Sequence, residues 1–241
     1  MSGLISFFVT FFPRAVMQGI PLLFGSTGEI LTEKSGNLNL GIPGTMYLGG
    51  IASLASAFFY ENACLKAGIT PNAFLCIIIA FVSAFAAGAL GGLIYSFLTT
   101  TLRANQNVTG LALTTFGIGL GNFFGGSLIK LVDSDMPSII LTKTSNFFRT
   151  SLPFADDLGW FGEIFLSHGV LIYLAIIIAL VSAFVLNKTR IGLNLRAVGE
   201  NPATADAAGI NVSRYRYAST CIGCAIAGLG GLSFIMDYLN G

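Results

Sequence analysis

Long apolar runs, separated by short polar segments, dominate the pattern of hydrophobic and polar positions along the chain. Six runs are long enough, or nearly so, for a membrane-spanning helix, which needs about 20 mainly apolar residues. Strands of a membrane barrel would instead alternate apolar and polar residues over about 10 positions. We therefore predict an all-α, polytopic membrane bundle of about six transmembrane helices, at residues 15–32, 41–60, 73–98, 108–129, 164–186 and 217–236.

The composition favours a membrane protein over a soluble one. Of the 241 residues, 54% are hydrophobic and only 10% are charged, whereas roughly 25% are charged in soluble domains. Lipid accepts apolar side chains on the outside of a protein, provided that the backbone hydrogen bonds are made internally. We expect one transmembrane domain over residues 1–241 in a lipid bilayer, with a formal net charge of +1 and no nucleic-acid partner.

Basic residues in short loops predict the orientation, because lysine and arginine are enriched on the cytoplasmic side. The segment 187–216 holds five of the twelve basic residues and should be cytoplasmic. Counting spans back from it places the turn near Lys34 and the loop near Arg103 on the same side. The loop near Glu61, the long loop 130–163 and the amino terminus are then expected outside.

Small residues recur at every fourth position in three of the expected spans. Such stripes let helix backbones approach closely, which matters in lipid because apolar burial does not drive helix association there. A dinucleotide-binding fingerprint is excluded, because the glycine spacing differs and lies within a helix. We expect packing stripes formed by Gly88 and Gly92, by Gly117, Gly121 and Gly125, and by Gly223, Ala227 and Gly231.

A polar stretch, RAVGENPATADAAGINVSRYR at residues 196–216, lies between the last two apolar runs. Asn201 is a good N-cap, Pro202 suits the first helical position, and Gly209 suits the left-handed turn after a helix end. The pattern predicts a helix of about two turns, a length that is marginal in water unless something holds it. It is either a lever that transmits a push from a soluble motor or an ordinary ordered loop.

Two stretches bring uncharged polar groups to the membrane. TEKSGNLNLGIPG at residues 32–44 breaks the backbone beside a span, which is typical of transporter binding sites, although the composition also suits a surface turn. In LRANQNVTGLALTTFG at residues 102–117, amides and hydroxyls suit a neutral, polyhydroxylated or heterocyclic solute, although threonines also bond to their own helix. The candidate pathway residues are Asn37, Asn39, Gln106, Asn107, Thr109 and Thr115.

Candidate catalytic groups are few. The one histidine, His168, and an isolated C-x-x-C at Cys221 and Cys224 do not predict a zinc site. TEKSG has Glu33 where a P-loop has glycine, so the chain does not hydrolyse nucleotides by that route. Glu29 lies within a span, where a carboxylate is either functional or reaches toward the interface. We expect no enzyme activity, no metal and no cofactor.

Three blocks of the sequence resemble one protein family. RIGLNLRAVGENPATADAAGINVSRYRY, residues 190–217, resembles the cytoplasmic coupling region of permease subunits in bacterial ATP-binding cassette (ABC) importers, in the group serving branched-chain amino acids, ribose and nucleosides. GEILTEKSGNLNLGIPGTMYLGG (28–50) and RANQNVTGLALTTFGIGL (103–120) are similar to nucleoside permeases that work with basic-membrane-protein-like binding lipoproteins. The first block is specific for the permease group, and the other two favour nucleosides over sugars or amino acids.

The resemblance implies a multi-pass permease of the bacterial plasma membrane that moves purine or related nucleosides inward. Its partners would be an ATP-binding cassette subunit, a second, related permease subunit and an external nucleoside-binding lipoprotein. Such permeases continue through further hydrophobic helices, so the resemblance also implies a C-terminal truncation at DYLNG. The implied contact with the ATP-binding subunit comprises Glu200, Asn201, Pro202, Ala203, Asp206, Ala207 and Gly209.

Three alternatives to a nucleoside importer stay open. The first is an ABC permease for a sugar or a branched-chain amino acid. The second is a secondary carrier or channel, and the third is a membrane scaffold that moves no solute. A P-loop subunit and a secreted binding lipoprotein encoded by neighbouring genes would favour the importer.

Overall fold

The computed structural model describes residues 3–131, 141–150 and 168–239, which form helices joined by turns. No strand occurs in these ranges, so the predicted all-α class is confirmed. π-helical segments follow α3 and α10. The elements are α1 (Gly3–Glu33), α2 (Ile42–Lys66), α3 (Ala73–Ser96), η1 (Phe97–Thr101), α4 (Gln106–Leu131), α5 (Thr142–Arg149), α7 (Val170–Lys188), α8 (Arg190–Glu200), α9 (Pro202–Ala207), α10 (Val212–Ser233) and η3 (Phe234–Leu239).

Five helices in the described part of the chain are long and apolar enough to cross a membrane, which confirms a polytopic bundle. They are α2, α3 with η1, α4, α7 and α10 with the start of η3, and they correspond to the last five predicted runs. The first predicted run, 15–32, is helical within α1, but α1 is not among the five. Gln18, Glu29 and several hydroxyl side chains interrupt its apolar residues.

Much of the predicted external loop lies outside the described residues, as does the start of the fifth predicted run at 164–167. Within that loop the structure describes α5, which packs against α3, α7 and η3. Its first turn is held by Glu61 of α2, whose carboxylate accepts hydrogen bonds from the backbone N–H and the hydroxyl of Thr144. The loop is therefore folded onto the bundle along α5.

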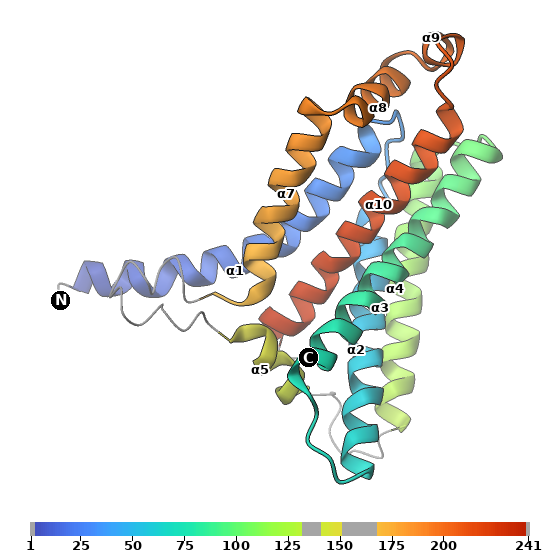
Figure 1. Cartoon of the computed structure of the whole chain (residues 1–241). Coiled ribbons are helices and arrows are strands. Elements are labelled where there is room, and N and C mark those ends of the chain that lie inside the picture. The colour runs from blue at the N-terminus through green and yellow to red at the C-terminus, as the bar shows by residue number, and fades with distance from the viewer. Residues whose placement is uncertain (1–2, 132–140, 151–167, 240–241) are drawn as a thin grey trace.

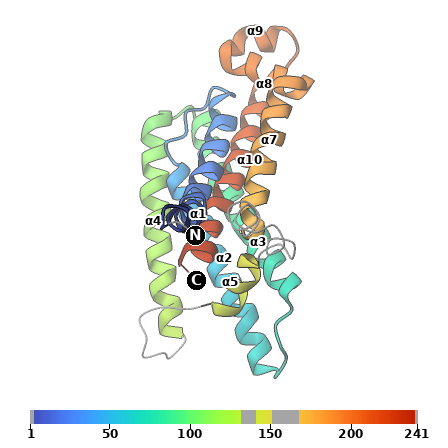
Figure 2. The same cartoon turned by 90° about the vertical axis from the view of Figure 1, so that its left-hand side faces the viewer.

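The bundle has two distinct ends (Figure 1). At one end lie α8 and α9, the α1–α2 turn and the α3–α4 connection, whereas the α2–α3 connection and α5 lie toward the other. Figure 2 shows α8 and α9 projecting beyond the ends of the neighbouring spans. Seven of the twelve basic residues lie at the α8–α9 end, which by charge is the predicted cytoplasmic end. They are Lys34, Arg103, Lys188, Arg190, Arg196, Arg214 and Arg216.

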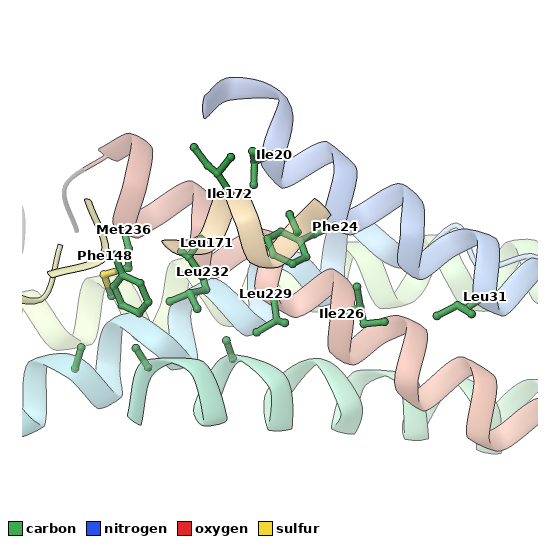
Figure 3. Close-up of a cluster of buried hydrophobic side chains, with 14 of the residues drawn as sticks. Ile20, Phe24, Leu31, Phe148, Leu171, Ile172, Ile226, Leu229, Leu232 and Met236 are labelled. Carbon is green, nitrogen blue, oxygen red and sulfur yellow. The ribbon is translucent and has the colours of Figure 1, made fainter. Parts of the chain in front are cut away.

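α10 is the central helix of the bundle. It packs against α1, α2 and α3, while α4 packs on the far side of α2. The most apolar part of α10 is 78% buried, against 39% or less in the other four candidate spans. Figure 3 shows Phe24 of α1, Leu229 of α10 and Leu171 of α7, which belong to one cluster of buried apolar side chains. This apolar cluster fixes α10 between its neighbours.

The predicted small-residue stripes are confirmed as contact faces between helices. A Cβ at Gly117 of α4 would collide with the backbone of Gly44 on α2. A Cβ at Gly92 of α3 would lie 2.8 Å from the Cβ of Cys224 on α10. Gly231 of α10 lies so close to α2 that a Cβ would overlap a backbone carbonyl. Close backbone approach thus replaces the apolar burial that would drive packing in water.

α1 is bent, and its N-terminal part points away from the bundle (Figure 1). Two prolines lie inside the helix, Pro13 and Pro21. Proline removes a backbone hydrogen bond and clashes with the preceding turn, so it is the ordinary cause of such a bend. The second half of α1 consequently runs alongside α10 and delivers the chain to the α1–α2 turn at the α8–α9 end.

Candidate functional site

The structure confirms the predicted short helix as α9, six residues long. Its N-terminus is capped as predicted, because Asn201 Oδ1 accepts a hydrogen bond from the backbone N–H of Thr204 at 3.1 Å. Pro202 occupies the first turn, where its missing N–H leaves no unpaired donor. The cap satisfies a donor that a helix start would otherwise leave without an intrahelical partner.

The C-terminus of α9 closes with two backbone hydrogen bonds around Gly209. This glycine has a φ of +82°, a left-handed conformation that favours glycine. Its N–H donates to the carbonyl of Asp206 at 2.9 Å, and the N–H of Ile210 donates to the carbonyl of Ala205 at 3.0 Å. The pair of bonds is a Schellman motif. Closure at both ends holds a helix that is too short to persist alone.

One face of α9 is open to a partner. Ala203, Asp206 and Ala207 are exposed and follow the i, i+3, i+4 spacing of a single helix face. Ala205 points the other way and is only 3% exposed. Of the remaining predicted coupling residues, Glu200, Asn201 and Gly209 are exposed, and Pro202 is half-buried.

A second helix, α8, occupies the segment 187–216 and is not predicted from the sequence. Thr189 caps its N-terminus, accepting a hydrogen bond from the N–H of Gly192 at 3.2 Å. Leu195 and Val198 are buried one turn apart. A capping residue followed by apolar positions at helical spacing is the signal that could have found α8. The structure shows α8 leading directly into α9 through Asn201.

Residues 34–41 join α1 to α2. We term them the buried turn because Ser35, Asn37, Asn39 and Gly41 are buried, although Lys34, Leu38 and Leu40 are exposed. Asn37 and Asn39 are each only 1% exposed. Asn37 Nδ2 donates to Thr220 Oγ1 at 3.0 Å, and Asn39 Nδ2 contacts Cys224 Sγ at 3.2 Å, both on α10. The stretch is therefore more than a plain surface turn, because both asparagine side chains pack within protein while Leu38 and Leu40 stay exposed.

Gln106, at the start of α4, holds the buried turn from the opposite side. Its Oε1 accepts from the N–H of Leu38 at 2.9 Å, and its Nε2 donates to the carbonyl of Gly36 at 3.1 Å. The hydroxyl of Tyr95 donates to the carbonyl of Leu38 at 2.6 Å. Three of the predicted pathway residues therefore meet at one turn, and their amides satisfy protein groups that would otherwise lack partners.

Glu29 also acts on the buried turn. Its Oε1 accepts from the backbone N–H of Asn39 at 3.1 Å, and its Oε2 accepts from the Thr32 hydroxyl at 3.2 Å. This carboxyl group, whose role the sequence leaves open, contributes to the fold of the turn.

The other three predicted pathway residues lie along α4. Asn107 and Thr115 are exposed, and Thr109 is buried at 7% exposure. The Thr115 hydroxyl donates to the carbonyl of Leu111, one turn back, at 3.0 Å. Thr115 thus makes the bond to its own helix that its residue type allows. The structure places these three residues on the helix that Gln106 begins, apart from the turn itself.

Three residues that hold the buried turn are missed by sequence reasoning. Tyr95 is fully buried, and a buried tyrosine hydroxyl usually has a partner, so its place near the end of an apolar run was a usable signal. In the sequence, Arg216 is only one of the basic residues that predict the orientation in the membrane. In the structure its Nε donates to the carbonyl of Ser35 at 3.3 Å. Nothing local marks Thr220, because its partner lies on a distant segment.

A cavity of about 460 Å³ opens between α7, α8 and α10, with a nearly wholly apolar lining that includes Val181, Leu195 and Ile222. Such a lining leaves the polar groups of a polyhydroxylated solute without partners, so it is a poor solute site. Within the described ranges, no group of three or more His, Cys, Asp or Glu side chains is placed to hold a metal ion. The buried turn and α9 remain the features that bear on function.

Residues 13–240 match the family described as "Branched-chain amino acid transport system / permease component". The chain belongs to this permease family. It is 32% identical over 223 residues to the guanosine ABC transporter permease protein NupQ of Bacillus subtilis, covering 91% of this chain and 65% of NupQ. It is 32% identical over 217 residues to the nucleoside ABC transporter permease protein NupC of Lactococcus lactis, covering 90% and 64%.

A third relative of this permease is the putative glucose ABC transporter permease protein TsgC13 of Haloferax volcanii, at 29% identity over 223 residues, covering 92% of this chain and 61% of the relative. The chain thus spans less than two thirds of the length of these relatives. No solved structure matches it significantly. Family membership and the five apolar helices make it a multi-pass protein of the bacterial plasma membrane.

Cysteine labelling at Ala203 tests on which side of the membrane α9 lies. Ala203 is exposed, whereas the neighbouring Ala205 is buried and serves as the matched control. In a variant without the four native cysteines, A203C should resist a membrane-impermeant maleimide in sealed cells and react after the cells are opened, and A205C should stay poorly labelled in both. Labelling of A203C in sealed cells would place α9 outside and contradict the predicted orientation.

Proposed function

We propose that this chain is a transmembrane permease subunit of an ABC importer that moves nucleosides, purine nucleosides in particular, into the cell. The observation that carries the proposal is α9, a helix capped at both ends that projects beyond the spans at the basic end of the bundle. A subunit of an ATP-driven transporter that carries no P-loop needs energy from another polypeptide. A short, stiff helix with one exposed face suits that contact.

Energy would reach the membrane through this helix. ATP-driven closure of partner subunits would displace the exposed face of Ala203, Asp206 and Ala207, and α8 would move with it because Asn201 joins the two helices. Rocking of packed helices is an established way to switch access between the two sides of a membrane. The permease itself would perform no chemistry, since hydrolysis belongs to the ATP-binding subunit.

The names of two relatives support a nucleoside as solute, since NupQ is named for guanosine and NupC for nucleosides. Uncharged amides and hydroxyls suit such a solute because they both donate and accept hydrogen bonds. We propose that Asn107 and Thr115 face the pathway from α4, and that Asn37, Asn39, Gln106 and Thr109 shape its wall. A second permease subunit and an external nucleoside-binding lipoprotein would complete the importer.

A sugar permease is the second candidate, favoured by the 29% identity to TsgC13, which is named as a putative glucose permease. A nucleoside carries a ribose, so hydrogen-bonding groups that suit one solute partly suit the other. The heterocycle separates the two, because only a nucleoside offers a base for stacking and edge recognition. Competition between solutes therefore discriminates between the two candidates.

Uptake into proteoliposomes tests the proposed function. The complete transporter, with its ATP-binding and second permease subunits and its binding protein, should accumulate labelled guanosine when ATP is supplied. Unlabelled adenosine should compete, whereas glucose and leucine should not, and a non-hydrolysable ATP analogue should abolish accumulation. ATP-dependent glucose uptake would favour the sugar permease instead. Uptake driven by an ion gradient without ATP would favour a secondary carrier.

A further inference from the structure

We propose that the buried turn is a relay that passes the displacement of α8 and α9 to α4, and that Gly199 is the residue at which the turn receives it. The inference rests on the proposed function and deepens it, because it names the route by which movement at the coupling helix reaches the spans. It follows from contacts that the buried turn makes on two opposite sides.

On the input side, the backbones of α8 and the buried turn touch. Gly199 lies in the last turn of α8, and a Cβ at this position would collide with the carbonyl of Lys34 and lie 3.2 Å from the Gly36 nitrogen. A Cβ at Gly36, whose φ is +85°, would lie 3.3 Å from the Gly199 Cα. No side chain separates the two segments. A shift of α8 therefore reaches the turn directly, since packed protein is barely compressible.

The first half of the turn is also tied to α1 and α10. Ser35 is fully buried, and its hydroxyl donates to the carbonyl of Thr32 at the end of α1 at 2.7 Å. Its own carbonyl accepts from Arg216 Nε of α10 at 3.3 Å. The Asn37–Thr220 bond is a second link to α10. These bonds fix the conformation of the turn, so it moves as a body and does not deform under load.

On the output side, the buried turn is bonded to two residues of α4, Gln106 and Thr114. The carbonyl of Gly36, the same residue that touches Gly199, accepts from Gln106 Nε2 at 3.1 Å. Farther along, the carbonyl of Leu40 accepts from Thr114 Oγ1 at 2.9 Å. A Cβ at Gly110, between these two α4 residues, would lie 2.8 Å from the Leu40 nitrogen. α4 is thus held to the turn along its first turns.

The buried turn connects two helices, α8 and α4, that do not pack against each other. In the described structure, the packed neighbours of α8 are α7, α9 and α10, whereas those of α4 are α2, α3 and η1. The buried turn touches both α8 and α4. It also continues into α2, against which α4 packs. A displacement of α8 therefore reaches α4 and α2 without first passing through a third helix.

Two variants, one at each side of the relay, test the proposal in the assembled transporter. G199A should force α8 away from the turn, and T114V should remove the bond to Leu40 while keeping the side-chain shape. For G199A we expect the number of nucleosides transported per ATP hydrolysed to fall about tenfold, which lies within the range of measured coupling effects. The rate of ATP hydrolysis should change by less than about twofold. T114V should lower the same ratio about threefold. The matched control is G19A, because Gly19 is a helical glycine with nothing within 4 Å of its Cβ position.

The outcomes separate the relay from the proposed function. If the wild-type assembly shows no nucleoside-dependent ATP hydrolysis, the importer proposal itself fails. If it does, and G199A keeps the transport-to-hydrolysis ratio of G19A, the relay is wrong. Should G199A not accumulate in the membrane, T114V decides, and an unchanged ratio in T114V overturns the proposal. In the double variant G199A/T114V, the transport-to-hydrolysis ratio should fall by less than the product of the two single-variant falls. The reason is that residues on one route are energetically coupled.

Discussion

Valine at position 231 is expected to lower the melting temperature of the permease by about 10 °C. Gly231 of α10 lies against α2, where a Cβ would overlap the carbonyl of Met46 and approach the nitrogen of Gly50 to 2.8 Å. Both are backbone atoms of a packed helix, so no side chain can rotate away. Overpacking a core costs roughly 1–3 kcal/mol even where side chains adjust, and each kcal/mol lowers the melting temperature of a chain this long by about 2–4 °C.

The measurement is thermal unfolding in detergent, followed by size-exclusion fluorescence. G119V is the matched control, because it makes the same chemical change within a span at a glycine whose Cβ would meet nothing within 4 Å. Its melting temperature should stay within about 2 °C of the wild-type value. A G231V protein that melts with the wild type would contradict the close contact between α10 and α2, and with it the central place of α10 in the bundle.

Charge reversal at Asp206 is expected to uncouple transport from ATP hydrolysis without unfolding the permease. Asp206 lies on the exposed face of α9, and only its backbone carbonyl takes part in closing the helix. D206K should therefore leave both ends of α9 intact. A like-charge contact at an interface costs several kcal/mol, and about 1.4 kcal/mol already corresponds to tenfold in affinity. We expect ATP-dependent nucleoside uptake to fall at least about tenfold.

E33K provides the control for this experiment. Glu33 is exposed at the end of α1, so its reversal makes the same change of net charge at the same end of the bundle, outside α9. Uptake by E33K should stay within about twofold of the wild type. Undiminished uptake by D206K, at wild-type levels of protein in the membrane, would contradict the proposed role of α9 as the contact with the ATP-binding subunit.

The sequence predicted the last five of its six spans and the ends of α9, because both depend on residues close together in the chain. A run of apolar residues is enough for a helix in lipid, where every backbone group must be paired within the segment. The caps of α9 are equally local, since Asn201 bonds to Thr204 and Gly209 bonds to Asp206. The small-residue stripes were predictable for the same reason, although the helices that they contact were not.

The roles of the polar residues near the membrane could not be predicted in this way. Asn37, Asn39 and Gln106 were singled out as candidate pathway residues from their residue type, and the structure shows that each also bonds to the protein. Their bonding partners lie 183, 185 and 70 residues away along the chain. A free amide and an amide that satisfies buried backbone look alike in the sequence, because the difference lies in which distant segment comes within hydrogen-bonding distance.

The sequence by itself determined that this protein is a helical membrane permease with a short capped helix between its last two long helices. Only the tertiary structure decided that α10 is central, that Asn37 and Asn39 are buried in the α1–α2 turn, and that Gly199 meets that turn backbone to backbone. The physical reason is the range of the interactions. Apolar length and helix caps act within a few residues, whereas helix packing and buried hydrogen bonds join segments whose separation no local pattern encodes.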